Sequence, residues 1–205
     1  MLWKIPQLFT PTTKRHIEQQ VLHNTNIHKL FRIIQDVDQY STFLPLCTYS
    51  KILPSSQRKL KEDGRHYFEA TLTVGVPPLL QETYDSAVYI NHQQFTVETH
   101  SIKSQKFDSL KSYWKLTSPS TVSPDNVADT LTSAENTTPN VPSNIHPQSH
   151  LHHSQTQQLQ PPTTHVYFMV EMTVSDPLII STLDQFLVKV AKQQVEAFAQ
   201  RCQST

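Results

Sequence analysis

Glycine is scarce in this chain, with only Gly64 and Gly75 among 205 residues. Loops that cradle phosphate groups need several glycines, because their backbone N–H groups must approach the phosphate closely. The sequence also contains no GxSxG motif and no HExxH motif. It therefore predicts neither a nucleotide-binding loop, nor the nucleophile turn of a serine hydrolase, nor a zinc-protease site.

Cysteine is equally scarce. The two cysteines, Cys47 and Cys202, lie far apart and form no CxxC pair or zinc-ligand spacing. This usage indicates a reducing compartment, in which the thiols serve as small apolar side chains. The spacing leaves a disulfide between the two residues open.

Long hydrophobic runs and an excess of charge are also missing. No apolar run reaches the roughly 20 residues of a membrane-spanning helix, and no secretory signal core is present. The 17 Lys and Arg residues balance 17 Asp and Glu residues, which gives a formal net charge of zero. Because there is no global positive field, we do not expect nucleic acid as a partner.

No Lys or Arg occurs between Lys115 and Lys189. Most of this stretch is a low-complexity segment, residues 118–163. The segment consists mainly of Ser, Thr, Pro, Asn, Gln and His, without any glycine or aromatic residue. Such a composition buries too little apolar surface to offset its ordering entropy. We predict a disordered insertion within a single domain formed by residues 13–117 and 164–202.

Histidine, in contrast, is plentiful, with 11 residues. Several lie in or beside the insertion: His146, His150, His152, His153 and His165. A metal site also needs neighbouring groups that orient its ligands, and the insertion offers no cysteine and no ordered carboxylate for this purpose. We therefore predict neither a metal site nor a cofactor.

Outside the insertion, apolar residues recur with the periods of helices and strands. Asn26 is a suitable N-cap for a helix over residues 27–37. Residues 178–201 follow Pro177 and contain neither Pro nor Gly, and they predict an amphipathic helix on the order of 35 Å long. The segments that alternate as strands do are residues 15–23, 48–53, 65–74, 82–90, 94–100, 110–116 and 165–174.

This order of elements indicates an α+β domain, in which a curved antiparallel sheet wraps around the long C-terminal helix and encloses an apolar space. Residues 38–47 are too irregular for a strand and too apolar for an exposed linker, so we expect a buried connection. Residues 74–80 form an apolar turn stiffened by Pro77 and Pro78. A pocket mouth, a membrane-touching tip, a lid and a buried turn all fit this sequence.

Three stretches together resemble the mitochondrial coenzyme Q-binding family of START-domain proteins, which is related to bacterial polyketide cyclase-like proteins. Residues 37–47 match the family's V-x-x-Y-x-x-F-x-P-x-C run. Residues 70–88, and residues 107–114 together with the closing helix, carry the rest of the resemblance. Two departures are Leu46, where relatives commonly have Trp, and an insertion longer than the family's.

The resemblance covers residues 13–116 and 164–202 and implies the START, or helix-grip, fold. It implies a protein that binds ubiquinone and supports ubiquinone biosynthesis and respiratory electron transport without being an enzyme. Such a protein would lie peripherally on the matrix side of the mitochondrial inner membrane, with ubiquinone-biosynthesis or respiratory-chain proteins as partners. Residues 1–12 would then be a targeting segment, although Pro6 and Pro11 would interrupt a targeting helix.

We expect a polyprenyl lipid to bind through its apolar surface, since burial is worth roughly 25 cal/mol per Å². Ser112 is one candidate partner for the polar head group, along with Tyr84, Ser86 and Trp114. The side chains predicted to line the cavity are Phe68, Ala70, Leu72, Tyr84, Ser86, Trp114, Phe168, Val170, Phe186 and Val190. We predict that one end of the cavity is closed by Phe43, Leu44 and Pro45. We predict that the turn from Val76 through Pro77 and Pro78 to Leu80 gates the cavity.

Three other functions remain alternatives at this point. A cyclase- or hydrolase-type enzyme on the same fold would need an acid or base with a shifted pKa in its pocket, and the strand interiors are mostly apolar. A protein-interaction module like the ribosome-associated bacterial relatives would favour a strongly basic surface, which the net charge does not provide. A membrane-surface adaptor would retain only a vestigial cavity.

Overall fold

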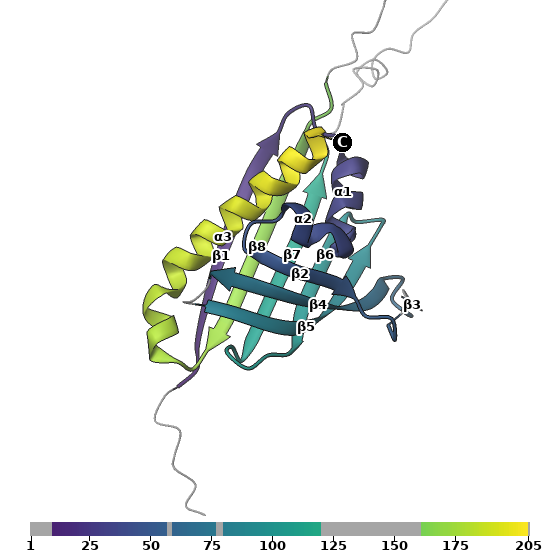
Figure 1. The fold of residues 1–205 in the computed structure, drawn as a ribbon. Coiled ribbons are helices and arrows are strands. Elements are labelled where there is room, and N and C mark those ends of the chain that lie inside the picture. Colours follow the sequence, from purple (N-terminus) through teal and green to yellow (C-terminus); the bar gives the residue numbers. More distant parts are fainter. Residues whose placement is uncertain (1–9, 57–58, 77–79, 120–160, 205) are drawn as a thin grey trace, which may run out of the picture. The chain divides into compact units, whose positions relative to one another are not determined.

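A single antiparallel sheet of eight strands dominates the computed structural model, which describes residues 10–56, 59–76, 80–119 and 161–204 (Figure 1). Most of residues 1–12 and 118–163 lie outside this description. The predictions of a targeting segment and of a disordered insertion therefore stay predictions.

The strands and helices follow one another as the sequence patterns predict, with an α+β composition. The strands are β1 (Thr12–Leu22), β2 (Cys47–Ile52), β3 (Lys59–Leu60), β4 (His66–Val76), β5 (Leu80–Asn91), β6 (Thr96–Lys103), β7 (Ser109–Thr117) and β8 (Thr164–Val174). The helices are α1 (Ile27–Gln35), the 3-10 helix η1 (Val37–Gln39), α2 (Tyr40–Phe43) and α3 (Pro177–Ser204).

The strand order is β1-β8-β7-β6-β5-β4-β2, and β3 pairs with β4 outside this path. All neighbouring strands run antiparallel. The first and last strands pair along their whole length, from Thr12 opposite Val174 to Leu22 opposite Thr164. Since β7 and β8 are neighbours, the long insertion joins two adjacent strands, and the sequence on either side of it forms one sheet.

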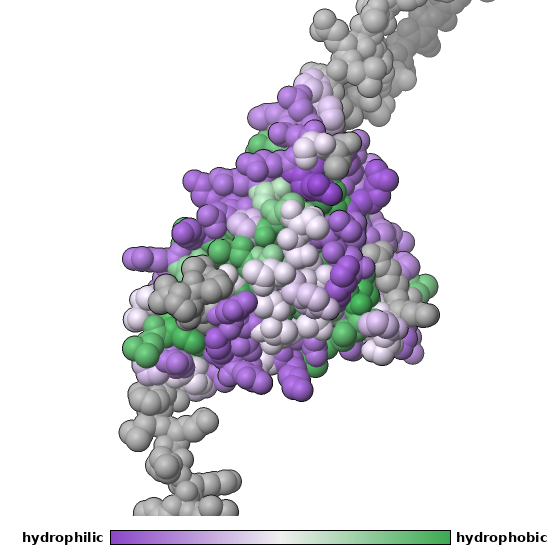
Figure 2. Space-filling view, viewed as in Figure 1, coloured by the Kyte–Doolittle hydropathy of each residue, from purple (hydrophilic) through white to green (hydrophobic). Residues whose placement is uncertain are grey.

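The period-2 pattern of the strands separates the two faces of the sheet. In β8, Val166, Phe168 and Val170 are buried, whereas Tyr167 and Met169 between them are partly exposed. The buried set lies on the concave face, and α3 crosses this face beside β1 and β8 (Figure 1). The apolar side of α3 is thereby covered. Seen from the side of α3, the surface is mostly hydrophilic, with hydrophobic residues in small separate patches (Figure 2).

Helix α1 begins where its N-cap predicts. The Lys29 N–H donates to Asn26 Oδ1 at 3.1 Å, which satisfies one of the free N–H groups of the first turn. The helix ends at Gln35, two residues earlier than predicted, because Asp36 has φ −89° and ψ 67° and so leaves the helical conformation. Leu30 and Ile34 are buried in the core between α1 and the sheet.

The connection over residues 38–47 is more regular than its sequence predicts, because it contains the end of η1 and the short helix α2. Two polar side chains fix it to β2. The Ile52 N–H donates to Asp38 Oδ1 at 2.8 Å, and the Ser41 N–H donates to Ser50 Oγ at 2.9 Å. These hydrogen bonds between side chains and backbone N–H groups order the connection, which the spacing of its apolar residues does not predict.

Strand β6 begins at Thr96, two residues later than predicted. The Asn91 side chain accepts hydrogen bonds from the N–H groups of Gln93 and Gln94, both at 3.0 Å, and so forms the turn between β5 and β6. Phe95 has a positive φ of 51° and belongs to this turn. The prediction of a strand start at residue 94 was therefore wrong because turn residues continued the alternating pattern.

Helix α3 supplies the largest helical share of the core. Its buried residues are Leu183, Leu187, Ala191, Val195, Phe198, Ala199 and Cys202. Near its C-terminal end it packs against α1, and along its length it packs against β1 and β8. No helix within the described residues is both long and apolar enough to cross a membrane.

Candidate ligand-binding cavity

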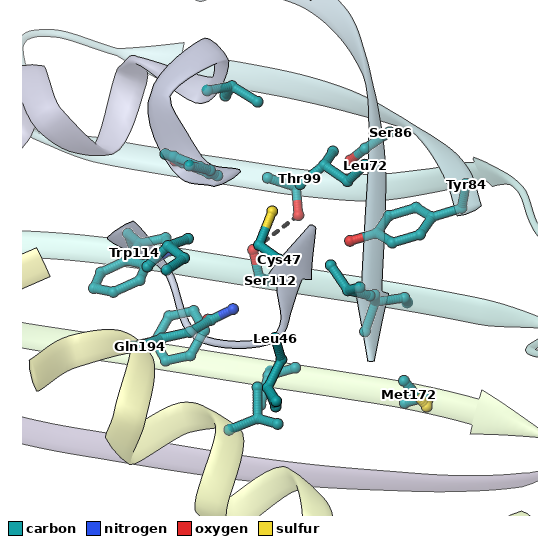
Figure 3. A pocket seen from close by; sticks show the side chains of 18 of the residues that line it. Leu46, Cys47, Leu72, Tyr84, Ser86, Thr99, Ser112, Trp114, Met172 and Gln194 are labelled. Atoms are coloured by element: carbon teal, nitrogen blue, oxygen red, sulfur yellow. Dashed lines mark hydrogen bonds between the residues drawn. The ribbon is translucent and has the colours of Figure 1, made fainter. Parts of the chain in front are cut away.

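A cavity of about 120 Å³ lies between α3 and the concave face of the sheet. The strands supply its floor, α3 supplies one wall, and the segment that leads into β2 supplies another (Figure 3). The side chains or backbones that line it belong to Val37, Tyr40, Leu44, Pro45, Leu46, Cys47, Leu72, Val74, Gly75, Tyr84, Ser86, Val88, Val97, Thr99, Leu110, Ser112, Trp114, Phe168, Val170, Met172, Phe186, Leu187, Val190, Gln194 and Phe198.

The lining carries no formal charge: none of the described residues that surround the cavity is Asp, Glu, Lys, Arg or His. An ionised ligand would lose its hydration without gaining an opposite charge, which costs several kcal/mol or more. The cavity is therefore suited to a neutral and mostly apolar molecule.

The titratable groups of the lining are two tyrosines and one cysteine. Burial raises the pKa of the Tyr40 and Tyr84 hydroxyls, because desolvation disfavours the phenolate. Burial raises the pKa of the Cys47 thiol for the same reason. All three groups are protonated at neutral pH, so they are poor nucleophiles and poor general bases.

One end of the cavity is aromatic. The Trp114 ring lies 4.2 Å from the Phe168 ring and 5.0 Å from the Phe198 ring, measured between centroids. The Tyr40 ring lies 5.3 Å from Phe198. The Tyr40 hydroxyl donates to the Ile34 carbonyl outside the cavity, so Tyr40 presents only its apolar ring to this end.

The polar groups in the middle of the cavity are hydroxyls of the neighbouring strands β5, β6 and β7 and the thiol of Cys47 in β2. The Thr99 and Ser112 hydroxyls share a hydrogen bond of 2.8 Å (Figure 3). The Ser86 hydroxyl donates to the His100 carbonyl at 3.4 Å, and the Cys47 thiol donates to the Tyr49 carbonyl at 3.4 Å. Each of these groups therefore already has a protein partner.

Two further polar side chains differ from these groups. Neither the Tyr84 hydroxyl nor the Gln194 amide has a hydrogen-bond partner among the described residues. Tyr84 belongs to β5 and Gln194 to α3, and both polar ends point into the cavity from opposite walls (Figure 3). They are available to a bound molecule.

No protein-family model and no curated protein matches this sequence. The fold, however, is well represented among solved structures. A START superfamily protein from Mycobacterium smegmatis is similar at a TM-score of 0.59 and 13% identity, over 93% of this chain and 97% of that one. This chain has the START, or helix-grip, fold. The predicted fold class is thereby confirmed.

Two enzymes are also similar in fold. The Zhui aromatase/cyclase from Streptomyces sp. R1128 has a TM-score of 0.50 and 11% identity, over 94% of this chain and 88% of that one. A truncated norcoclaurine synthase from Thalictrum flavum has a TM-score of 0.53 and 8% identity, over 93% and 94% of the two chains. The START fold thus carries catalysis in some proteins, and the groups in the cavity must decide its use here.

The structure places most of the predicted site residues on the cavity wall of this START fold. Those on the wall are Leu44, Pro45, Leu72, Tyr84, Ser86, Trp114, Phe168, Val170, Phe186 and Val190. Their contact with a ligand stays a prediction.

The other predicted residues lie elsewhere. Phe68 and Ala70 are 0% exposed and do not line the cavity, which begins further along β4 at Leu72. Phe43 lies behind the wall, with its ring 5.3 Å from the Phe198 ring. The predicted gate, Val76 with Pro77 and Pro78, lies outside the residues whose side chains are described.

Leu46 is a lining residue that the predicted site omits. Its φ of 66° lies in the left-handed region, which costs a non-glycine residue roughly 1–2 kcal/mol. The Gly75 N–H donates to the Leu46 carbonyl at 2.8 Å and holds this conformation. No sequence pattern reports such a backbone angle. Thr99 and Gln194, in contrast, could have been included from their strand face and their helix stripe.

Proposed function

We propose that this START-fold protein binds ubiquinone in the cavity between α3 and the sheet and does not catalyse a reaction. The observation that carries the proposal is the uncharged, largely apolar lining, interrupted by only a few polar groups. Ubiquinone is neutral, has a small oxygen-bearing ring and carries a long apolar tail, so it meets each of these properties. Burial of apolar area at roughly 25 cal/mol per Å² supplies the affinity.

The size of the cavity limits how the ligand binds. At about 120 Å³ it is close to the roughly 150 Å³ of a protein cavity that takes up benzene, and below the roughly 300–1,000 Å³ of pockets for larger ligands. The existing space therefore holds only part of the substituted ring. The rest of the ligand, including the tail, requires α3 to move away from the sheet.

An enzyme on the same fold has less support. The START-fold enzymes named above show that catalysis is compatible with the architecture. Acid–base catalysis needs a group whose pKa lies near the working pH. In the part of the cavity that the structure describes, burial moves the pKa of Tyr40, Tyr84 and Cys47 upward, away from neutrality.

The cellular role belongs to the same proposal. We infer that the protein acts as a lipid chaperone at the matrix face of the mitochondrial inner membrane, where it supports ubiquinone biosynthesis and respiratory electron transport. Its partners there are biosynthetic or respiratory-chain proteins. The support for this role is the sequence resemblance carried by residues 37–47 and 70–88.

Lipid that co-purifies with the full chain tests the proposal. The chain is expressed in mitochondria of its own cells, purified in the absence of detergent exchange, extracted with organic solvent and analysed by mass spectrometry. We expect ubiquinone in a near-stoichiometric amount. A protein without lipid, or a lipid mixture that follows the composition of the membrane, would contradict the proposal and favour a protein-interaction role.

A further inference from the structure

We propose that the Tyr84 hydroxyl and the Gln194 amide form a two-point clamp that donates hydrogen bonds to two oxygens at opposite ends of the bound ring. This inference rests on the proposed function and names the residues that select the head group. The clamp is built from one strand and one helix on opposite walls of the cavity (Figure 3).

The Tyr84 ring is held in place by a turn at the end of β6. The Glu82 side chain is 6% exposed, and its Oε1 accepts the Ser104 hydroxyl at 2.9 Å and the Gln105 N–H at 2.6 Å. This turn fixes Phe107, whose ring packs edge-on against Tyr84 with centroids 5.3 Å apart. The hydroxyl at the far end of a fixed ring has a defined position, which is what recognition of a ligand atom requires.

Gln194 interrupts an apolar stripe of α3. It lies one turn after Val190 and one turn before Phe198, which both line the cavity. Placing a polar amide here costs the free energy of removing it from water, and the amide makes no hydrogen bond to the described residues in return. A ligand that accepts a hydrogen bond recovers this cost. The amide can rotate to present either its NH₂ or its oxygen.

The hydroxyl and thiol groups on the sheet side of the cavity already have protein partners. Thr99 bonds to Ser112, and the Ser86 and Cys47 groups donate to backbone carbonyls. The Trp114 indole N–H at the aromatic end also has no hydrogen-bond partner among the described residues, but the Tyr84 hydroxyl and the Gln194 amide are the free donors that face each other from opposite walls (Figure 3). A flat, neutral ring with two opposed carbonyl oxygens matches them, and a para-quinone has this chemistry. A hydrocarbon ring offers no acceptor, and a phosphate head group brings a charge that the lining does not neutralise.

Two isosteric variants of the full chain, Tyr84→Phe and Gln194→Met, test the clamp. The probes are decyl-ubiquinone and decylbenzene, which share a six-membered ring and a decyl tail, whereas decylbenzene lacks the carbonyl oxygens, the methoxy groups and the methyl group of the quinone. Affinities are measured by titration calorimetry. We expect each variant to bind the quinone roughly tenfold more weakly than the unmodified chain, and the double variant to be weaker again. Decylbenzene affinity should change by less than about twofold, since it uses only apolar contacts.

The outcomes separate the clamp from the proposed function. If the unmodified chain does not bind decyl-ubiquinone, whether or not it binds decylbenzene, the proposed function is wrong and the clamp with it. If the chain binds decyl-ubiquinone and both variants keep that affinity, the clamp is wrong and the proposed function stands. If a variant loses affinity for both probes equally, its side chain shapes the cavity and makes no selective hydrogen bond, which also overturns the clamp. Decylbenzene binding serves at the same time as the check that each variant is folded.

Discussion

Val190→Glu is expected to abolish ubiquinone binding, with a loss of affinity of more than about 100-fold. Val190 lies on α3 and lines the cavity. A carboxylate there would enter a space whose described lining has no formal charge, and an unpaired charge in such surroundings costs several kcal/mol. At about 1.4 kcal/mol for each factor of ten, this cost exceeds 100-fold in affinity. Titration with decyl-ubiquinone measures the loss.

Val188→Glu is the matched control for this variant. Val188 belongs to the same helix, two residues away, and is 47% exposed. The same substitution there adds the same charge to solvent, so binding should change by less than about threefold, as surface substitutions usually cost within about 0.5 kcal/mol. Circular dichroism and the thermal midpoint would show that both variants are folded. Equal losses in the two variants would contradict the assignment of the cavity.

Trp114→Ala is expected to lower the free energy of unfolding by about 3–5 kcal/mol, because truncation of a large buried aromatic removes its packing and leaves a cavity. Trp114 is 5% exposed, and its ring contacts those of Phe168 and Phe198 at the aromatic end of the cavity. Urea denaturation with a linear extrapolation gives this free energy. The midpoint should fall while the slope of the transition stays unchanged.

Trp114→Phe is the control, since it keeps an aromatic ring at the same place. It should cost less than half of what the alanine variant costs, because most of the contacts with Phe168 and Phe198 can be retained. A loss below about 1 kcal/mol for Trp114→Ala would contradict the packing described here, since surface positions behave in that way. The aromatic end would then be open to solvent.

The periodic signals of the sequence predict the α+β architecture well because they are long, whereas the START fold itself was implied by the family resemblance. Residues 165–174 alternate over a whole strand, and the long run after Pro177 gives a helix that crosses the sheet. Such patterns identify the buried face of an element. They do not identify the position along a strand at which packing gives way to a cavity. Phe68 and Leu72 share the inner face of β4, and only Leu72 reaches the cavity.

The rest of the site depends on features that leave no period in the sequence. The order of residues 38–47 comes from hydrogen bonds of Asp38 and Ser50, which join segments distant in the chain. The left-handed conformation of Leu46 depends on a single bond from Gly75. Tertiary contacts of this kind override local preference.

The fold alone does not distinguish binding from catalysis, because START-fold neighbours include an aromatase/cyclase and norcoclaurine synthase. The lining of the cavity does bear on this question. Its described residues are neutral, and the pKa of the Tyr40, Tyr84 and Cys47 groups is raised by burial. The proposed function therefore requires that a quinone occupies this cavity.

Tryptophan fluorescence measures that occupancy most directly. The chain has two tryptophans, Trp3 and Trp114, so a Trp3→Phe chain retains a single emitter in the cavity wall. A quinone ring in contact with Trp114 should quench its emission. Titration with decyl-ubiquinone is expected to give saturable quenching with one site per chain, which the further substitution Val190→Glu removes. Quenching that rises linearly without saturation, or that is unaffected by Val190→Glu, would contradict ubiquinone binding in this cavity.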